Sequence, residues 1–225
     1  MIAVTIITAV ITIVACALGG GRWWGYYPAR IWARIFCWLT FVKVTVSGRD
    51  NISADTAYVF VANHQGAYDI FSIYGYLNHN FRWMMKSGLR SIPLVGYACE
   101  KSQQIYVDKS SPSALKRTMS RAESLLSKGM SIVVFPEGAR TFDGKVRQFK
   151  RGAFTLAQEF NLPVVPVTID GAYSVLPRTS KLPRPGHIHL TIHKPILPGE
   201  QGHDMQQLIT VSRQTIVETL PERYR

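Results

Sequence analysis

The stretch Tyr58–Asp69 reads Tyr-Val-Phe-Val-Ala-Asn-His-Gln-Gly-Ala-Tyr-Asp and joins an unbroken apolar run to a short polar turn. The run 58–62 has the composition of a buried strand, and residues 69–77 have the pattern of a helix. Gly66, between them, can adopt a backbone angle that other residues avoid. A buried strand, a turn and a helix in this order are typical of an α/β sheet.

His64 and Asp69 lie five positions apart within this stretch. Along a single helix, five residues turn the chain by about 500°, so the two side chains would point apart. We therefore expect His64 on the turn and Asp69 in the first turn of the helix, reaching back to His64. An imidazole oriented by a carboxylate can take a proton from an alcohol near neutral pH, which contributes roughly 10² to 10⁴ in rate. The alternative is a capping histidine beside an ordinary acidic residue at a helix start.

Strand and helix patterns continue to alternate along the chain. We predict further strands at residues 42–46, 81–85, 132–135, 164–169 and 188–192, and helices at 111–128 and 152–160. Together they predict an α/β fold with a mixed, largely parallel sheet that helices cover on both faces. Pro163 and Pro166 bracket one strand, which favours an edge position or a strand start.

Composition limits the partners of the protein. The 225 residues fit one large domain. Because 26 Lys and Arg stand against 14 Asp and Glu, we expect a negatively charged partner: nucleic acid, anionic lipid or a phosphorylated small molecule. No zinc-finger spacing, basic heptad helix or aromatic RNA-binding signature is present, so we expect no nucleic acid and favour an anionic membrane surface or phosphate. Three cysteines without a CxxC spacing argue against a disulfide framework and suit a reducing compartment.

Residues 2–18 form an uncharged, mostly apolar run, at the short limit for a helix that spans a bilayer. A secretory signal is one alternative, but such signals begin with basic residues, and no Lys or Arg precedes Arg22. Residues 13–16 (Ile-Val-Ala-Cys) faintly resemble a lipoprotein processing site. The basic residues that follow, from Arg22 to Lys43, predict an inner-membrane protein whose remaining chain faces the cytoplasm.

A second segment, residues 23–41, is rich in aromatic residues and carries a few arginines. Trp and Tyr concentrate at the level of lipid headgroups, so we expect an interfacial or re-entrant amphipathic helix. The alternative is an aromatic-rich helix of the core. We therefore divide the chain into an N-terminal membrane anchor of transmembrane or interfacial helices, residues 1–41, and a globular domain, residues 42–225.

Residues 135–140 (Phe-Pro-Glu-Gly-Ala-Arg) follow a predicted strand directly. Ligands of α/β sheets bind at such strand ends, so Glu137 and Arg140 are candidates for a binding site. Further cations follow closely: Lys145, Arg147, Lys150 and Arg151. Such a concentration of positive charge suits a phosphate, which arginine can hold through two hydrogen bonds. The alternative is a solvated basic loop.

Five stretches of the chain resemble the glycerolipid acyltransferase family. They are, in order, His64 with Asp69 as its His-x4-Asp first motif, residues 105–109 as the second, 135–140 as the third, 149–154 as the segment after it and 164–169 as the fourth. Four motifs in order make the match specific. The pattern is most similar to bacterial 1-acylglycerol-3-phosphate (lysophosphatidic acid) acyltransferases.

The resemblance implies that residues 42–225 adopt the glycerolipid acyltransferase fold. It implies acyl transfer, without metal or cofactor, from acyl-CoA or acyl carrier protein to the free hydroxyl of 1-acylglycerol-3-phosphate, giving phosphatidic acid. The partners would be this lysophospholipid, the acyl donor and the membrane surface. His64 would be the base, Asp69 would orient it, and amides of the His64 turn are candidate oxyanion donors. The implied substrate-binding residues are Glu137, Gly138, Arg140, Lys109, Lys150 and Arg151.

Three positions depart from the family pattern. Lys109 stands where the second motif usually ends in arginine, Gln103 replaces its opening glycine, and Ala139 replaces a Thr or Ser of the third motif. Lysine keeps the charge but loses the two-pronged contact with phosphate. Lyso-ornithine lipid, lyso-glycine lipid and glycerol-3-phosphate therefore remain alternative acceptors. A non-catalytic basic protein of the membrane surface is a further alternative, but it does not explain His64 and Asp69.

Three histidines at positions 187, 189 and 193 alternate with apolar residues and could share one strand face. A metal site would be possible there. No acidic or cysteine partner is close in sequence, so we expect ordinary surface histidines and no metal.

Overall fold

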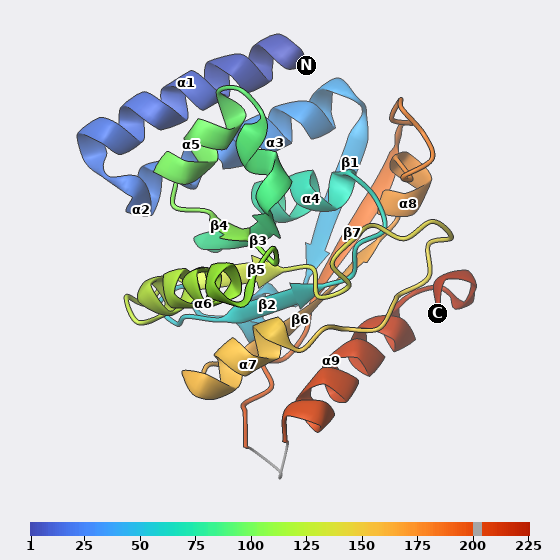
Figure 1. Cartoon of the computed structure of the whole chain (residues 1–225). Helices are drawn as coiled ribbons and strands as arrows, with labels where there is room; N and C mark the ends of the chain where they lie inside the picture. The colour runs from blue at the N-terminus through green and yellow to red at the C-terminus, as the bar shows by residue number, and fades with distance from the viewer. Residues whose placement is uncertain (200–203) are drawn as a thin grey trace.

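The computed structural model describes residues 1–199 and 204–225, and a seven-stranded sheet lies at its centre (Figure 1). Its strands are β1 (Val42–Ser47), β2 (Val59–Ala62), β3 (Phe81–Lys86), β4 (Ile105–Val107), β5 (Ser131–Val134), β6 (Val164–Asp170) and β7 (Gly186–Ile192). They lie in the order β1-β7-β6-β2-β5-β3-β4, and every neighbouring pair is parallel except β6 with β7. The predicted mixed, largely parallel sheet is confirmed.

Helices cover both faces of the sheet. They are α1 (Ile2–Gly19), α2 (Gly21–Trp24), α3 (Tyr27–Leu39), α4 (Tyr68–Tyr76), α5 (Val95–Lys101), α6 (Pro112–Leu126), α7 (Gly152–Glu159), α8 (Ala172–Val175) and α9 (Met205–Thr219), with short 3₁₀ turns η1 (Arg49–Asn51), η2 (Ser87–Ser91) and η4 (Glu222–Tyr224). Alternate residues of β2 belong to different cores, as its two-residue period requires. Phe60 packs with α3 and α4, whereas Val59 and Val61 pack with α6, α7 and α9.

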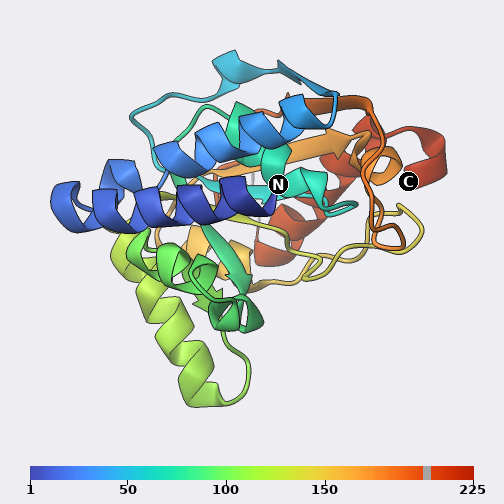
Figure 2. The same ribbon diagram turned by 90° about the horizontal axis from the view of Figure 1, so that it is seen from above.

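The N-terminal helices lie along one side of this sandwich. Seen from above, α1 crosses the molecule beside α3 (Figure 2). Among the described residues, α1 is the one helix long and apolar enough to cross a membrane, judged by length and composition. The helical path is interrupted after α2, and α3 begins at Tyr27. Helix α3 buries Ala33 and Cys37 in the core, while Trp38 is 75% exposed. The buried face of α3 agrees with the alternative of an aromatic-rich core helix, and the interfacial helix stays a prediction.

Two local predictions were wrong. The φ of Gly66 is not positive; glycine is needed because a Cβ there would meet the carbonyl oxygens of Ala172 and Leu176. The edge position suggested by Pro163 and Pro166 is wrong, since β6 lies between β7 and β2, whereas the alternative of a strand start holds for Pro163, which directly precedes β6. Proline is tolerated at position 166 because β7 ends beside it. The Pro166 carbonyl still accepts from His193 N–H, and beyond the end of β7 the strand pairing needs no N–H donor from residue 166.

The three histidines near β7 bind hydroxyl groups. Thr45 Oγ1 lies 2.8 Å from both His187 Nε2 and His189 Nδ1, and Thr168 Oγ1 lies 2.8 Å from His193 Nε2. Within residues 1–199 and 204–225, no group of three His, Cys, Asp or Glu side chains could hold a metal ion.

Candidate active site

The site forms where β2 and β5 end side by side. Val61 of β2 is in register with Val134 of β5, so the residues that follow, Asn63 and His64 on one side and Phe135 on the other, come together. Asn63 fixes the β2 end to β6: its Nδ2 donates to the Ile169 carbonyl (2.9 Å), and Ile169 N–H donates to its Oδ1 (2.8 Å). The amide side chain therefore extends the strand pairing by one position, to the residue before His64.

His64 and Asp69 meet as the five-residue spacing predicts. His64 Nδ1 lies 2.7 Å from Asp69 Oδ2, which also accepts a hydrogen bond from Gly66 N–H (2.8 Å). Asp69 is fully buried in the first turn of α4, and the His64 side chain is 14% exposed. Because a carboxylate only accepts, Nδ1 carries the hydrogen and Nε2 presents its lone pair. The predicted pair is confirmed as a geometry, and Nε2 is free to accept a proton.

The imidazole of His64 is held on its flat side as well. Its ring stacks on Phe135 with a centroid separation of 3.9 Å and an interplanar angle of 6°. Phe135 in turn packs against Trp83 of β3 at 5.1 Å. The hydrogen bond and the stacking together restrict the orientation of the His64 ring in two directions.

Glu137 supports the same turn from β5. Its Oε1 accepts from His64 N–H (2.7 Å) and its Oε2 from Arg147 N–H (2.8 Å), and the residue is 6% exposed. Burial raises the pKa of Glu137 to about 7, although both backbone donors favour its charged form. Both carboxyl oxygens are thus bound by backbone amides of the protein.

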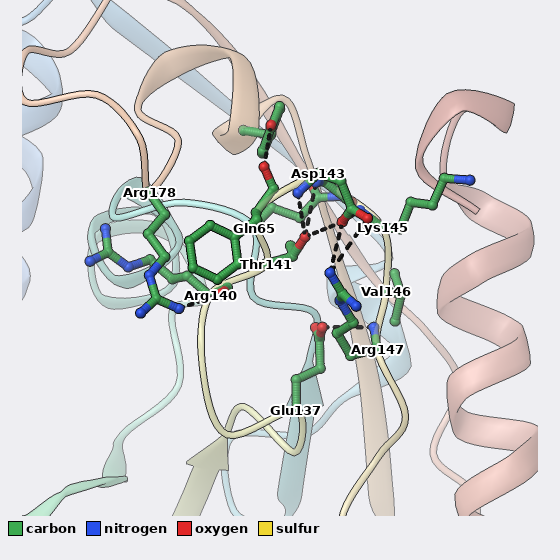
Figure 3. Close-up of polar contacts among 12 residues, drawn as sticks. Gln65, Glu137, Arg140, Thr141, Asp143, Lys145, Val146, Arg147 and Arg178 are labelled. Atoms are coloured by element: carbon green, nitrogen blue, oxygen red, sulfur yellow. Dashed lines mark hydrogen bonds and ion pairs between the residues drawn. The ribbon is translucent and has the colours of Figure 1, made fainter.

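The loop after Glu137 is ordered by polar contacts rather than by secondary structure (Figure 3). Thr141 Oγ1 donates to Asp143 Oδ1 (2.6 Å) and accepts from Gly144 N–H (2.9 Å), while Gln65 Nε2 donates to the Gly144 carbonyl (2.6 Å). The hydrogen bonds from Thr141 and from the Lys145 amide lower the pKa of Asp143. Gln65 thereby ties this loop to the turn that carries His64.

Three amides of the His64 turn are occupied within the protein. His64 N–H donates to Glu137, Gly66 N–H to Asp69, and Ala67 N–H to the Leu176 carbonyl (3.2 Å). None of the three can bind an oxyanion without giving up its present acceptor. These three amides are therefore poor candidates for the oxyanion donors that the resemblance implies at this turn.

A cavity of about 880 Å³ opens beside His64, within the range of small-molecule sites. Its wall is largely apolar and includes Trp83, Met84, Val134, Phe135 and residues of α1, α5 and α6. Four of the predicted site residues line it: His64, Gly138, Lys109 and Lys150. Gly138 has a φ of 81°, and a Cβ there would lie 2.7 Å from Lys150 Nζ, so glycine allows the ammonium to approach the backbone.

Arg140 and Arg151 lie outside this cavity wall. Figure 3 shows Arg140 beside Arg178, on the side of the loop away from Arg147. Arg178 donates to the Arg140 carbonyl (3.3 Å), and its guanidinium lies 4.3 Å from the centre of the Phe142 ring. Arg151 is exposed just before α7. The basic stretch predicted from the sequence is therefore distributed over several surfaces.

Sequence reasoning missed two sets of wall residues. Lys86 lines the cavity and could have been found, because it directly follows the predicted strand 81–85, at the same end of the parallel strands as His64. Thr5, Thr8 and Thr12 of α1 also line it, and Trp32 Nε1 donates to Thr5 Oγ1 (3.0 Å). Their spacing places them on one face of an otherwise apolar helix, which was the available signal.

The chain is similar in sequence to known acyltransferases. The acyltransferase family model matches residues 43–170. The chain is 33% identical over 197 residues to the chloroplastic 1-acyl-sn-glycerol-3-phosphate acyltransferase LPAT1 of Arabidopsis thaliana, covering 87% of this chain and 54% of the plant protein. A 1-acyl-sn-glycerol-3-phosphate acyltransferase of Pseudomonas aeruginosa is 30% identical over 171 residues, covering 74% of this chain and 65% of that protein.

A similar fold is seen in the crystal structure of the 1-acyl-sn-glycerophosphate (LPA) acyltransferase PlsC from Thermotoga maritima. The two share 25% identity with a TM-score of 0.74, over 95% of this chain and 92% of that one. The chain spans little more than half the length of the plant relative. The family model covers more than half of the chain, and the chain therefore belongs to the acyltransferase family.

Proposed function

We propose that this protein transfers an acyl chain from acyl-CoA or acyl carrier protein to the free hydroxyl of 1-acylglycerol-3-phosphate, giving phosphatidic acid for phospholipid synthesis. The observation that carries the proposal is the His64–Asp69 pair at the wall of a large apolar cavity that also holds lysines. An acyl chain needs the apolar wall, and a phosphate needs the cations. The names of the relatives and of the similar crystal structure support the same reaction.

In this mechanism His64 Nε2 takes the proton of the acceptor hydroxyl while Asp69 stabilises the imidazolium that forms. The hydroxyl oxygen attacks the thioester carbonyl, and a tetrahedral intermediate carries the negative charge. Collapse of the intermediate breaks the carbon–sulfur bond, and the imidazolium returns its proton to the thiolate. The thioester is already activated, so the reaction requires no metal or prosthetic group.

We assign the acceptor phosphate to the lysines of the cavity wall. Lys109 and Lys150 with Gly138 were predicted to bind substrate, and Lys86 joins them. Arg140 and Arg151 remain predicted contributors to headgroup binding from outside the wall. For Glu137 we favour a positioning role, because both of its oxygens accept from backbone amides.

We further propose that the protein works at the cytoplasmic face of the inner membrane, with α1 lying in the bilayer interface. The threonine face of α1 lines the cavity, while Ile6, Val10 and Val14 of the same helix are exposed to solvent. A helix with one face on the domain and the other apolar suits the interface better than a span. Cations along the N-terminal region would face anionic headgroups.

Parallel acceptors test the proposal. Purified protein is given one acyl donor at a time, acyl-CoA or acyl carrier protein, with lysophosphatidate, lyso-ornithine lipid, lyso-glycine lipid or glycerol-3-phosphate, and products are identified by mass spectrometry. We expect phosphatidate as the main product. If only an amino-acid lipid or glycerol-3-phosphate were acylated, that compound would replace lysophosphatidate as the proposed acceptor. Vesicle binding without any product would contradict the proposal that the protein is an enzyme.

A further inference from the structure

The middle of the chain carries an unexpected group of exposed apolar side chains. Leu89, Ile92, Leu94 and Tyr97 are 40%, 43%, 45% and 51% exposed, all within the 89–97 segment that runs from η2 into α5. Four large apolar residues exposed so close together are uncommon on the surface of a soluble monomer. No long apolar run in the sequence marks this segment.

This surface adjoins that of α1. Helix α5 packs directly against α1, and both views draw the two helices next to each other (Figures 1 and 2). The face of α1 that is turned to solvent includes Ile7, Ile11 and Val14, each exposed by about half. Two stretches about 80 residues apart in sequence therefore expose apolar side chains on neighbouring elements.

The inner sides of the same two elements line the cavity. Leu89, Val95 and Ala98 contribute from the segment and its helix, and Thr5 and Thr8 contribute from α1. Ile92, Leu94 and Tyr97 are not part of that wall. The exposed surface and the cavity are thus two sides of one thin layer of protein.

The backbone holds the exposed residues in place. Leu94 has a φ of 60°, a conformation that costs an L-residue free energy. Hydrogen bonds fix the turn: Gly96 N–H donates to the Ile92 carbonyl and Ala98 N–H to the Leu94 carbonyl, both at 2.8 Å. A strained turn that presents apolar residues to water indicates that something other than the described protein covers them.

The charged groups around the segment suit a lipid surface. Lys101 Nζ lies 5.2 Å from the centre of the Tyr97 ring, and Lys86 is exposed just before η2. Arg90 donates to both oxygens of Glu100 at 3.1 Å, which neutralises this pair. Apolar residues bordered by an aromatic ring and lysines are typical of the boundary between acyl chains and headgroups.

We infer that the 89–97 segment is a second bilayer-contacting element, whose Ile92, Leu94 and Tyr97 enter the acyl-chain layer beside α1. The inference rests on the proposed lipid acceptor. A lysolipid in the same leaflet then has its chain next to the wall of the cavity. The acceptor enters from the membrane, between α1 and the 89–97 segment, rather than from water.

A fluorescent probe at position 94 tests the contact directly. NBD is attached to Leu94→Cys, and in parallel to Ile92→Cys, in full-length protein whose Cys16, Cys37 and Cys99 are replaced by Ala. Leu197→Cys is the matched control, because Leu197 is 39% exposed and its segment, 193–199, lies at the end of the molecule opposite α1 (Figure 1). The protein is mixed with phosphatidylglycerol–phosphatidylcholine vesicles that carry acyl-chain quenchers.

We expect blue-shifted, strongly quenched emission at position 94 or 92 and neither effect at 197. Equal emission at all three positions would overturn the inference. A blue shift that appears without vesicles and grows with protein concentration would identify a second copy of the chain as the occupant, and would overturn it too.

Kinetics separate this inference from the proposed function. Leu94→Glu should raise the KM for long-chain lysophosphatidate in vesicles about tenfold or more, because a carboxylate in the acyl layer is costly. Turnover of a short-chain, water-soluble lysophosphatidate should stay at the wild-type level, as should both activities of Leu197→Glu. An unchanged KM with vesicles contradicts the membrane contact; absence of turnover with either acceptor in wild type contradicts the proposed function instead.

Discussion

The Glu137 carboxylate connects three segments of the chain through two hydrogen bonds. It accepts from His64 N–H and from Arg147 N–H, so the turn that carries His64 and the loop after β5 share one anchor. Burial makes this arrangement sensitive to protonation, since the pKa of Glu137 rises to about 7. The residue therefore links the stability of the site to pH near neutrality.

Replacing Glu137 with Gln tests this link. Between pH 4.5 and 7 the folded protein holds a proton on Glu137 that the unfolded chain has released. This contribution to stability is fully present below pH 4.5 and is lost as pH rises through 7, by up to roughly 3 kcal/mol. We expect the unfolding free energy of wild type minus that of Glu137→Gln, measured in urea, to fall over this range. A difference that stays constant or rises with pH would contradict the account.

The sequence predicts the His64–Asp69 pair because its spacing allows few geometries, and a strand end plus a helix start determine both positions. It does not predict which cations reach the cavity. Lys150 lines the wall while Arg140 and Arg151 do not. Their directions depend on a loop whose course is set by distant contacts, such as that of Gln65 with Gly144, and local patterns carry no information on these.

At the level of elements, Arg82 of β3 attaches the N-terminal helices to the sheet. The side chain is fully buried and donates to the Phe81 carbonyl at 2.7 Å, to the Arg22 carbonyl at 2.8 Å and to the Gly21 carbonyl. Burial lowers the pKa of Arg82. The Gly21 carbonyl also accepts from Gly25 N–H, and the Arg22 carbonyl from Asn80 Nδ2 at 2.9 Å. One guanidinium thus adds charge-assisted hydrogen bonds that tie the backbone of α2 to β3.

We expect Arg82→Met to destabilise the protein by roughly 3–5 kcal/mol, because it removes several buried, charge-assisted hydrogen bonds between β3 and α2 at once. Trypsin should then cut faster after Arg22 and Arg30, as the N-terminal helices loosen. The stability of Arg82→Lys, which keeps one donor group, should lie between those of the wild type and Arg82→Met. Urea unfolding and timed proteolysis measure both effects, and wild-type stability of Arg82→Met would rule out the attachment.

Element types are predictable here because parallel strands are continuous apolar runs and amphipathic helices have a clear period. The surroundings of each element in the fold are harder to predict. Pro166 suggests an edge strand because proline lacks a donor, yet its missing N–H faces the place where β7 ends. Gly66 suggests an unusual backbone angle, whereas the real constraint is the close approach of the α8 backbone at Ala172 and of Leu176 after it. Both depend on a neighbour far away in sequence.

At the scale of the molecule, the N-terminal helices have two different relations to the domain. Helix α1 exposes most of its surface, whereas α3 buries Phe36 and Cys37 against α4. The predicted division at residue 42 separates α3 from the helix it covers. Strand order was not predictable either, because it depends on which strands pair across long connections.

Two truncated variants test whether α1 and α3 contribute differently to the stability of the domain. We expect a variant without residues 1–19 to stay folded but to lose most binding to anionic vesicles. A variant without residues 1–41 should aggregate or unfold, because it exposes the apolar face of α4. Circular dichroism, size-exclusion chromatography and vesicle flotation check these outcomes. A stable, monomeric 42–225 fragment would instead support an independent domain from residue 42.

The proposed role of His64 is tested by the rate at which His64→Ala makes phosphatidate from lysophosphatidate and the preferred acyl donor. Asp69→Asn is measured beside it, and Asp143→Asn serves as a control from the neighbouring loop. We expect a loss of roughly 10² to 10⁴ in kcat for His64→Ala, with unchanged circular dichroism. His64→Ala that turns over at the wild-type rate would contradict this role.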